Sequence, residues 1–133
     1  MDAWELLIDH MAGRRERVAA ALRLEEVPEH LARYEREDDP YGLGQYMSLN
    51  LYHYVTTGEF EKVEAFVRTL IDSGSVETLY VDGLMSQHPR RVLREVLEME
   101  RARESPRDLG PIRRALNLLV VYDEGRDRLG SSE

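Results

Sequence analysis

Apolar residues at steps of three and four run through residues 42–74, and this spacing constrains the fold more than any other feature. An α-helix places such residues on one side, so the spacing predicts two helices rather than strands. Polar residues 56–58 interrupt the pattern once, and residues 72–74 end it. Because short connections join antiparallel neighbours, we expect a helical hairpin whose apolar faces meet. Any site would then lie on the outer edge of the hairpin.

The same helical spacing recurs along the chain as far as residue 124, and strand-like alternation is scarce. We therefore predict an all-α fold, a single compact domain of about six to eight helices in antiparallel hairpins with HEAT-like or bundle packing. Residues 75–102 repeat the layout of residues 43–73 and predict a second hairpin. Residues 1–124 form the predicted helical domain, and residues 125–133 are expected to be a polar tail. One further predicted core stripe comprises Trp4, Leu7, Ile8 and Met11.

The absence of cysteine removes several kinds of chemistry. The chain can have no thiol nucleophile, no cysteine-ligated zinc or iron–sulfur cluster, and no disulfide. No apolar run in the sequence approaches the roughly 20 residues of a membrane span. The first residues are acidic, whereas a secretory signal begins with basic residues, so we expect a cytoplasmic protein of bacterial type.

The net charge of −8 disfavours nucleic acid as a partner of the whole surface. Arginines gather in one segment, where they could form an anion patch: Arg90, Arg91, Arg94, Arg101 and Arg103, with Arg113 and Arg114 nearby. Glu95 and Glu98 lie among these arginines. The interpretation that we favour is therefore a helix surface with ion pairs, and the anion patch is the alternative.

Patterns that carry enzyme chemistry are absent from the sequence. None of the four histidines, His10, His30, His53 and His88, lies four residues from another, and there is no phosphate loop or nucleophile elbow. Paired glutamates are abundant, as expected for a solvated helix surface. We predict no catalytic residue, no metal ligand and no cofactor, and His88 before Pro89 is expected to start a helix.

The run YMSLNLYHYVTTGEFEKVEAFVRTLIDSGSVETLYVDGLM, within residues 45–85, resembles a family of small helical bacterial proteins that contain a HEAT-like helix pair. The marks of the resemblance are a helix that ends at Gly58, an aromatic residue, Phe60, just after it, and a second helix that ends at Gly74. Some relatives of this type are immunity or antitoxin-like proteins. The resemblance therefore implies a binding function, and it identifies no site residue.

Acidic residues and amphipathic aromatic rings mark the candidate partner-binding site. Such rings are favoured at protein interfaces, because one end is apolar and the other can form a hydrogen bond. The predicted partner-binding residues are Glu35, Glu37, Asp38, Asp39, Tyr41, Tyr52 and His53.

Two classes of function fit the sequence best. The first is a non-enzymatic protein-binding domain, such as an immunity or antitoxin-like protein that masks a basic toxin through its acidic surface. The second is a helical scaffold or adaptor that associates with itself, for example as a homodimer. A metal-dependent enzyme and a nucleic-acid-binding protein are further alternatives, and no membrane partner is expected.

Overall fold

The computed structural model describes residues 3–80, 88–103 and 107–131. In these ranges the chain forms α1 (Ala3–Met11), α2 (Arg15–Ala21), a 3-10 turn (Leu24–Glu26), α3 (Val27–Arg36), α4 (Pro40–Thr56), α5 (Phe60–Asp72), α6 (Ser75–Thr78), α7 (Pro89–Arg101) and α8 (Gly110–Ser131). The described residues contain no strand. The predicted all-α fold is therefore confirmed.

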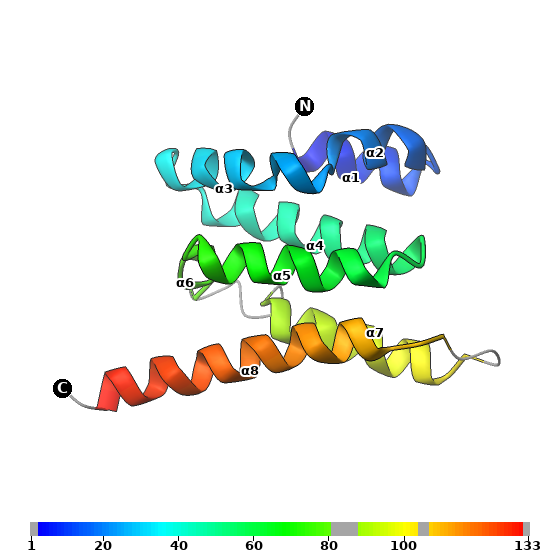
Figure 1. Cartoon of the computed structure of the whole chain (residues 1–133). Coiled ribbons are helices and arrows are strands. Elements are labelled where there is room, and N and C mark those ends of the chain that lie inside the picture. The colour runs from blue at the N-terminus through cyan, green and yellow to red at the C-terminus, as the bar shows by residue number, and fades with distance from the viewer. Residues whose placement is uncertain (1–2, 81–87, 104–106, 132–133) are drawn as a thin grey trace.

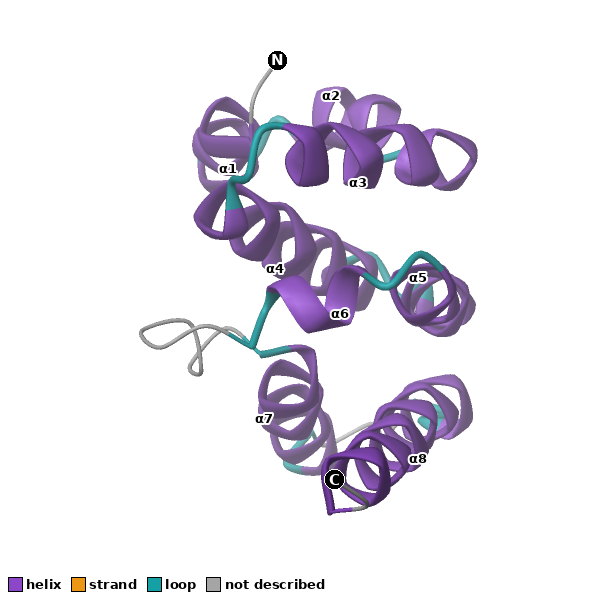
Figure 2. Ribbon diagram, turned by 90° about the vertical axis from the view of Figure 1, so that its left-hand side faces the viewer, coloured by secondary structure: helices purple, strands orange, loops and turns teal. Residues whose placement is uncertain are grey.

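The helices form three stacked layers (Figure 1). The first layer holds α1, α2 and α3, the second holds α4 and α5, and the third holds α7 and α8 (Figure 2). Helix α4 contacts α1 and α3 on one side and α7 on the other, while α5 packs along α8. The middle layer is thus covered from both sides, and the outer layers each have one face in solvent.

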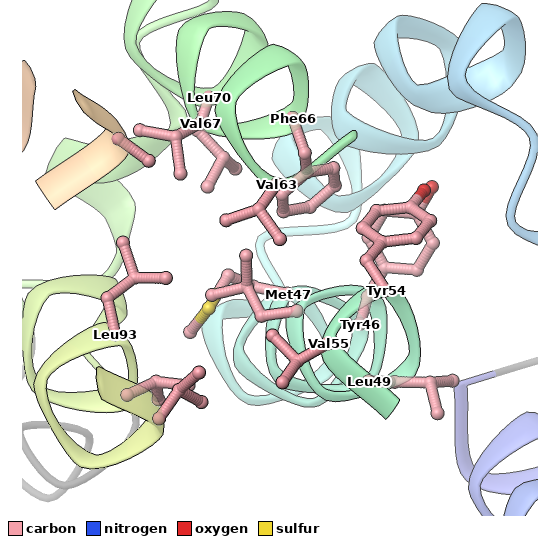
Figure 3. Packing of buried hydrophobic residues seen from close by; sticks show 14 of the residues in the cluster. Tyr46, Met47, Leu49, Tyr54, Val55, Val63, Phe66, Val67, Leu70 and Leu93 are labelled. Carbon is pink, nitrogen blue, oxygen red and sulfur yellow. The ribbon is translucent and has the colours of Figure 1, made fainter. Parts of the chain in front are cut away.

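Helix α4 is the centre of the core. It carries ten buried residues over most of its circumference, including Tyr46, Met47 and Leu51, and a helix with so wide a buried face is stable only when several neighbours cover it. Phe66 of α5 packs edge-on against Tyr46, with ring centroids 6.1 Å apart (Figure 3). The Tyr54 hydroxyl lies 2.8 Å from the carbonyl oxygen of Leu22 and so joins α4 to the end of α2.

The predicted hairpin of α4 and α5 is confirmed. Helix α4 ends at Thr56, and the chain reverses at Gly58, whose φ is +78°. Helix α5 ends at Asp72, and Gly74 follows with φ +76°. Both glycines adopt the left-handed conformation that a side chain with a Cβ disfavours, so they stop the helices where the sequence predicts.

Two helices begin with a proline behind a capping side chain. Asp39 Oδ1 accepts a hydrogen bond from the Gly42 amide at 2.9 Å and caps α4. His88 Nδ1 accepts one from the Arg90 amide at 3.2 Å and caps α7, as the sequence predicts. Each cap satisfies an amide that has no carbonyl partner within the first turn.

The predicted core stripe of α1 is wrong. Ala3 and Leu6 face α4, whereas Trp4, Ile8 and Met11 remain 56%, 41% and 68% exposed. Leu7 is half-buried between the two sets. The helix carries apolar residues over more than one face, and the helical period alone cannot say which face meets the core.

The predicted second hairpin, in which residues 75–102 form two helices that pair with each other, is also wrong. Helix α6 is a single turn, and α7 pairs with α8 instead. The expected helical residue Leu84 lies outside the described residues. Helix α8 continues to Ser131, beyond the expected start of a polar tail at residue 125. Arg126 contributes to this extension, because its Nε donates to Glu77 Oε1 at 2.9 Å and ties the helix to α6.

Candidate protein-interaction surface

Exposed carboxylates gather where α3 ends and the chain turns into α4. Glu35, Glu37 and Asp38 are all exposed, and we call these three residues the acidic corner. Within the described part of the chain, no ion pair involves any of them. Tyr41 stands beside the corner in the first turn of α4 and is 60% exposed. Four of the predicted site residues are thus free to meet a partner.

Asp39, which the sequence also assigned to the site, has a structural role. Its carboxylate is half-buried and caps α4 through the Gly42 amide. A Cβ added at Gly42 would clash with Asp39 Oδ2, so glycine at this position lets the cap lie close to the helix. Asp39 therefore holds the acidic corner in place and has less freedom to bind a partner.

Asp38 holds an unusual backbone conformation, with a φ of +50°. It is the only residue other than glycine with positive φ among those described. The left-handed region is disfavoured by about 1–2 kcal/mol for residues with a Cβ, although aspartate tolerates it better than most. The conformation turns the chain sharply between Glu37 and Asp39.

Tyr52 lies at the edge of a separate apolar groove of about 470 Å³ between α1, α4 and α7. The groove is lined by Leu7, His10, Gln45, Ser48, Leu49, Tyr52, Thr56 and Val92. Partial burial raises the pKa of the Tyr52 hydroxyl, and the Glu95 carboxylate raises it further. The phenol therefore stays protonated beside that carboxylate, at the mouth of the groove.

His53 does not belong to the exposed surface. Its side chain is 1% exposed, and neither ring nitrogen has a hydrogen-bond partner among the described residues. The ring packs edge-on against His10, with centroids 5.5 Å apart. Burial lowers the pKa of His53, and the neighbouring His10 lowers it further. The expected position of His53 on the outer surface is therefore wrong, because α4 is enclosed on the side that carries it.

Three residues that sequence reasoning assigned to the core are exposed instead. Trp4, Ile8 and Met11 follow one another along one side of α1, and we call them the α1 stripe. On a helix with about 100° per residue, Leu7 lies between this stripe and the core side, so the stripe continues into the apolar groove. The sequence could have indicated this exposure, because α1 has more apolar residues than one buried face requires.

The α1 stripe and the acidic corner are parts of one surface. Trp4 lines a hollow of about 410 Å³ together with Arg33, Glu37 and Asp39. Gln45 lines both this hollow and the apolar groove. Residues 33–39 carry four carboxylates and two guanidinium groups, so the apolar band ends in a segment of net negative charge. This arrangement is the one expected of a surface that binds an amphipathic segment carrying positive charge.

The described residues offer little else that resembles a reactive centre. Among them, no three histidine, aspartate or glutamate side chains lie close enough together to hold a metal ion. None of the described helices has the length and apolar character needed to cross a membrane. Comparisons with family models, with curated proteins and with solved structures give no match to this chain.

Proposed function

We propose that this chain is a non-enzymatic protein-binding domain that recognises a basic partner through the α1 stripe and the acidic corner. One observation carries the proposal: Trp4 of the exposed apolar stripe shares a hollow with Glu37 and Asp39. Arg33 lines the same hollow, but residues 33–39 carry four carboxylates against two guanidinium groups. Apolar contact area and net negative charge therefore lie next to each other on the same face.

The apolar half of this surface favours a partner that covers it. Removing a large apolar side chain from water yields about 1.5–3 kcal/mol, and α1 exposes three such side chains in a row. An amphipathic helix from a partner could lie along α1 and place its own apolar residues against Trp4 and the groove beside Leu7. Tryptophan is also among the residues that most often dominate binding energy.

The acidic half favours a partner that carries lysine or arginine. Glu35, Glu37 and Asp38 have no ion pair of their own among the described residues, so a basic partner would not have to break one. Complementary charge speeds association and rejects wrong partners. A basic toxin is one partner of this chemistry, and the resemblance to immunity and antitoxin-like proteins supports the same role.

A second copy of the chain suits the surface less well. A symmetric dimer through the α1 stripe would bring two acidic corners of a chain with net charge −8 toward each other. Like charges across an interface are unfavourable. The self-associating scaffold is therefore an alternative outcome of the test rather than a second proposal.

The test uses the full tagged chain to purify partners from the source organism, followed by titration of the isolated partner. Trp4 is the only tryptophan, so its fluorescence emission should shift to the blue when a partner covers it. The double variant Glu37→Arg/Asp38→Arg should weaken binding about tenfold or more, as should Trp4→Ser when it is followed by calorimetry.

A matched control reverses two exposed carboxylates elsewhere, in Glu61→Arg/Glu98→Arg near the start of α5 and the end of α7. This control changes the net charge equally and should leave the affinity within about twofold. The proposal fails if both double variants weaken binding equally. It also fails if sedimentation shows a dimer of the isolated chain that Trp4→Ser dissociates, because the stripe would then serve self-association.

A further inference from the structure

A second hollow, away from the acidic corner, lies where α7 begins beside α8. It has a volume of about 540 Å³ and is lined by Tyr80, His88, Arg90, Arg91, Arg94 and Asp123. Three guanidinium groups thus face one carboxylate, in a chain whose overall charge is −8. The volume is within the range of about 300–1,000 Å³ that small-molecule sites occupy.

The single carboxylate of the hollow is already engaged. Asp123 Oδ2 accepts a hydrogen bond from Arg90 Nη1 at 2.9 Å, and Oδ1 accepts one from the Tyr80 hydroxyl. The Arg126 guanidinium lies over the Tyr80 ring, 4.0 Å from its centroid, and holds that ring in place. Asp123 therefore orients Arg90 and Tyr80. It forms no ion pair with Arg91 or Arg94, the other two arginines that line the hollow.

His88 supplies the second observation. Its side chain is only 5% exposed, and Nδ1 is occupied as the acceptor of the Arg90 amide. A neutral imidazole that accepts at Nδ1 carries its proton on Nε2. Burial lowers the pKa of His88, which keeps the ring neutral near pH 7. Nε2 is shielded from solvent and has no hydrogen-bond partner among the described residues.

Arg90 and Arg94 add donors of the same kind. The Nε group of Arg90 is also shielded and without a partner among the described residues, although Nη1 of the same guanidinium binds Asp123. Arg94 is exposed one helical turn further along and takes part in no ion pair within the described part of the chain. Arg91, in contrast, forms an ion pair with Glu95, with 3.7 Å between Arg91 Nε and Glu95 Oε1. Donors with no acceptor outnumber acceptors here, and a buried donor left unpaired costs about 1–3 kcal/mol.

We propose that this hollow binds a small phosphate-bearing anion, with Arg90, Arg94 and His88 as the residues that recognise the phosphate group. A phosphate offers several acceptor oxygens in different directions, and guanidinium groups bind it with charge-assisted hydrogen bonds. The start of α7 adds the positive end of a helix dipole. The hollow is larger than a phosphate group, so it has room for a small organic group attached to the phosphate.

The experiment titrates the full chain with inorganic phosphate and with phenyl phosphate by calorimetry, using sodium chloride at the same ionic strength as the reference. Both phosphates should bind, and chloride should not. Tighter binding of phenyl phosphate would identify a phosphomonoester as the preferred source, whereas equal binding would identify free phosphate. The proposal is wrong if neither phosphate binds at concentrations up to about 10 mM.

Two variants locate the site. Arg94→Gln removes an exposed guanidinium and should weaken binding about tenfold without affecting the fold. His88→Asn removes the Nε2 donor but keeps an acceptor that caps α7, so it should weaken binding about fivefold while the helix remains capped. Circular dichroism and a thermal unfolding curve confirm that both variants fold.

Arg101→Gln is the matched control, because Arg101 is exposed on α7 and does not line the hollow. Its affinity should stay within about twofold of the unaltered chain. Equal weakening by Arg101→Gln and Arg94→Gln would overturn the proposal in favour of diffuse attraction. Binding of a DNA duplex that Arg94→Gln and Arg113→Gln weaken equally would overturn it in favour of an extended polyanion surface.

Discussion

Helices α4 and α1 both carry apolar residues at helical spacing, and they have opposite environments. Most side chains of α4 are buried by α1, α3, α5 and α7, and only a narrow strip that includes Tyr41 and Tyr52 reaches solvent. Helix α1 buries Ala3 and Leu6 against α4 and exposes Trp4, Ile8 and Met11. The position of a helix in the stack therefore decides whether its apolar residues stabilise the fold or remain available to a partner.

The largest expected effect tests this contrast directly. Phe66→Ala removes a fully buried ring that packs on Tyr46 and Tyr54, and it should lower the free energy of unfolding by about 3–5 kcal/mol. Trp4→Ala removes a larger but mostly exposed side chain and should lower it by less than about 1 kcal/mol. Urea unfolding followed by circular dichroism measures both. Equal losses would show that Trp4 belongs to the core as the sequence predicts.

A smaller effect concerns the contact between the middle and third layers. Arg107 Nε donates to Glu100 Oε2 at 3.0 Å, and Arg107 Nη2 reaches the Val55 carbonyl at the end of α4 at 3.3 Å. Arg107→Met leaves the buried Glu100 with only Arg103, whose Nε is 3.6 Å away. The free energy of unfolding should fall by about 2–3 kcal/mol.

The control for this prediction is Arg103→Gln, which removes the more exposed partner and should lower stability by less than about 1 kcal/mol. The double variant Glu100→Leu/Arg107→Met should recover part of the loss, because it leaves no buried charge unpaired. If Arg107→Met has no effect, this ion pair does not hold α7 against α4.

The third prediction joins the two helices through His10 of α1 and His53 of α4. Burial lowers the pKa of both below 6.5, Arg15 lowers both further, Lys62 also lowers that of His53, and Glu59 opposes these effects at His53. Because the unfolded chain binds protons more readily than the folded one, stability should be full above pH 6.5 and should decrease as the pH falls below it. Urea midpoints between about pH 7.5 and about pH 5.5, roughly one unit on either side of 6.5, measure this decrease.

His53→Leu should make this pH dependence shallower. At pH 7.5 the variant should be as stable as the parent or more stable by up to about 1 kcal/mol, since it replaces two unpaired buried nitrogens with apolar groups. His30→Gln, which alters a half-buried histidine on α3, is the comparison, and it should also make the pH dependence shallower, because burial lowers the pKa of His30 too. An unchanged slope in His53→Leu would mean that another group takes up the proton.

The smallest effect separates charge from backbone strain in the acidic corner. Asp38→Ala should lower stability by about 1 kcal/mol, because alanine is disfavoured at a φ of +50°. Asp38→Gly should stay within about 0.5 kcal/mol of the parent, since relief of strain is offset by the freedom of glycine in the unfolded chain. Both variants lose the same charge, so both should lower the affinity for a basic partner equally. Unequal weakening would show that the loop conformation, rather than the charge, is recognised.

Local signals in the sequence were sufficient for several features. Polar residues followed by Gly58 and Gly74 predicted the ends of α4 and α5, because glycine alone readily adopts positive φ. His88 before Pro89 predicted the start of α7. Within the candidate site, the exposure of Glu35, Glu37, Asp38 and Tyr41 was also predictable, since three charges and a proline mark a surface loop.

Features that depend on distant contacts were not predictable in this way. The enclosed position of His53 follows from the packing of α1 against α4, and the exposure of Trp4 follows from the same contact. Helix α7 pairs with α8, a choice between two helical neighbours that apolar spacing leaves open. The hollow at the start of α7 joins His88 to Asp123, and their proximity is set by the α7–α8 pairing.

The sequence by itself determined that this chain is helical, where its central hairpin turns and that its surface is acidic. These properties follow from the helical period, from glycine and proline conformation, and from composition. Only the tertiary structure decided which apolar face of α1 is left in solvent, which carboxylates border it, and which arginines share a hollow with His88. The physical reason is that burial and electrostatic environment depend on which helices are neighbours, and neighbours are chosen by the packing of the whole stack.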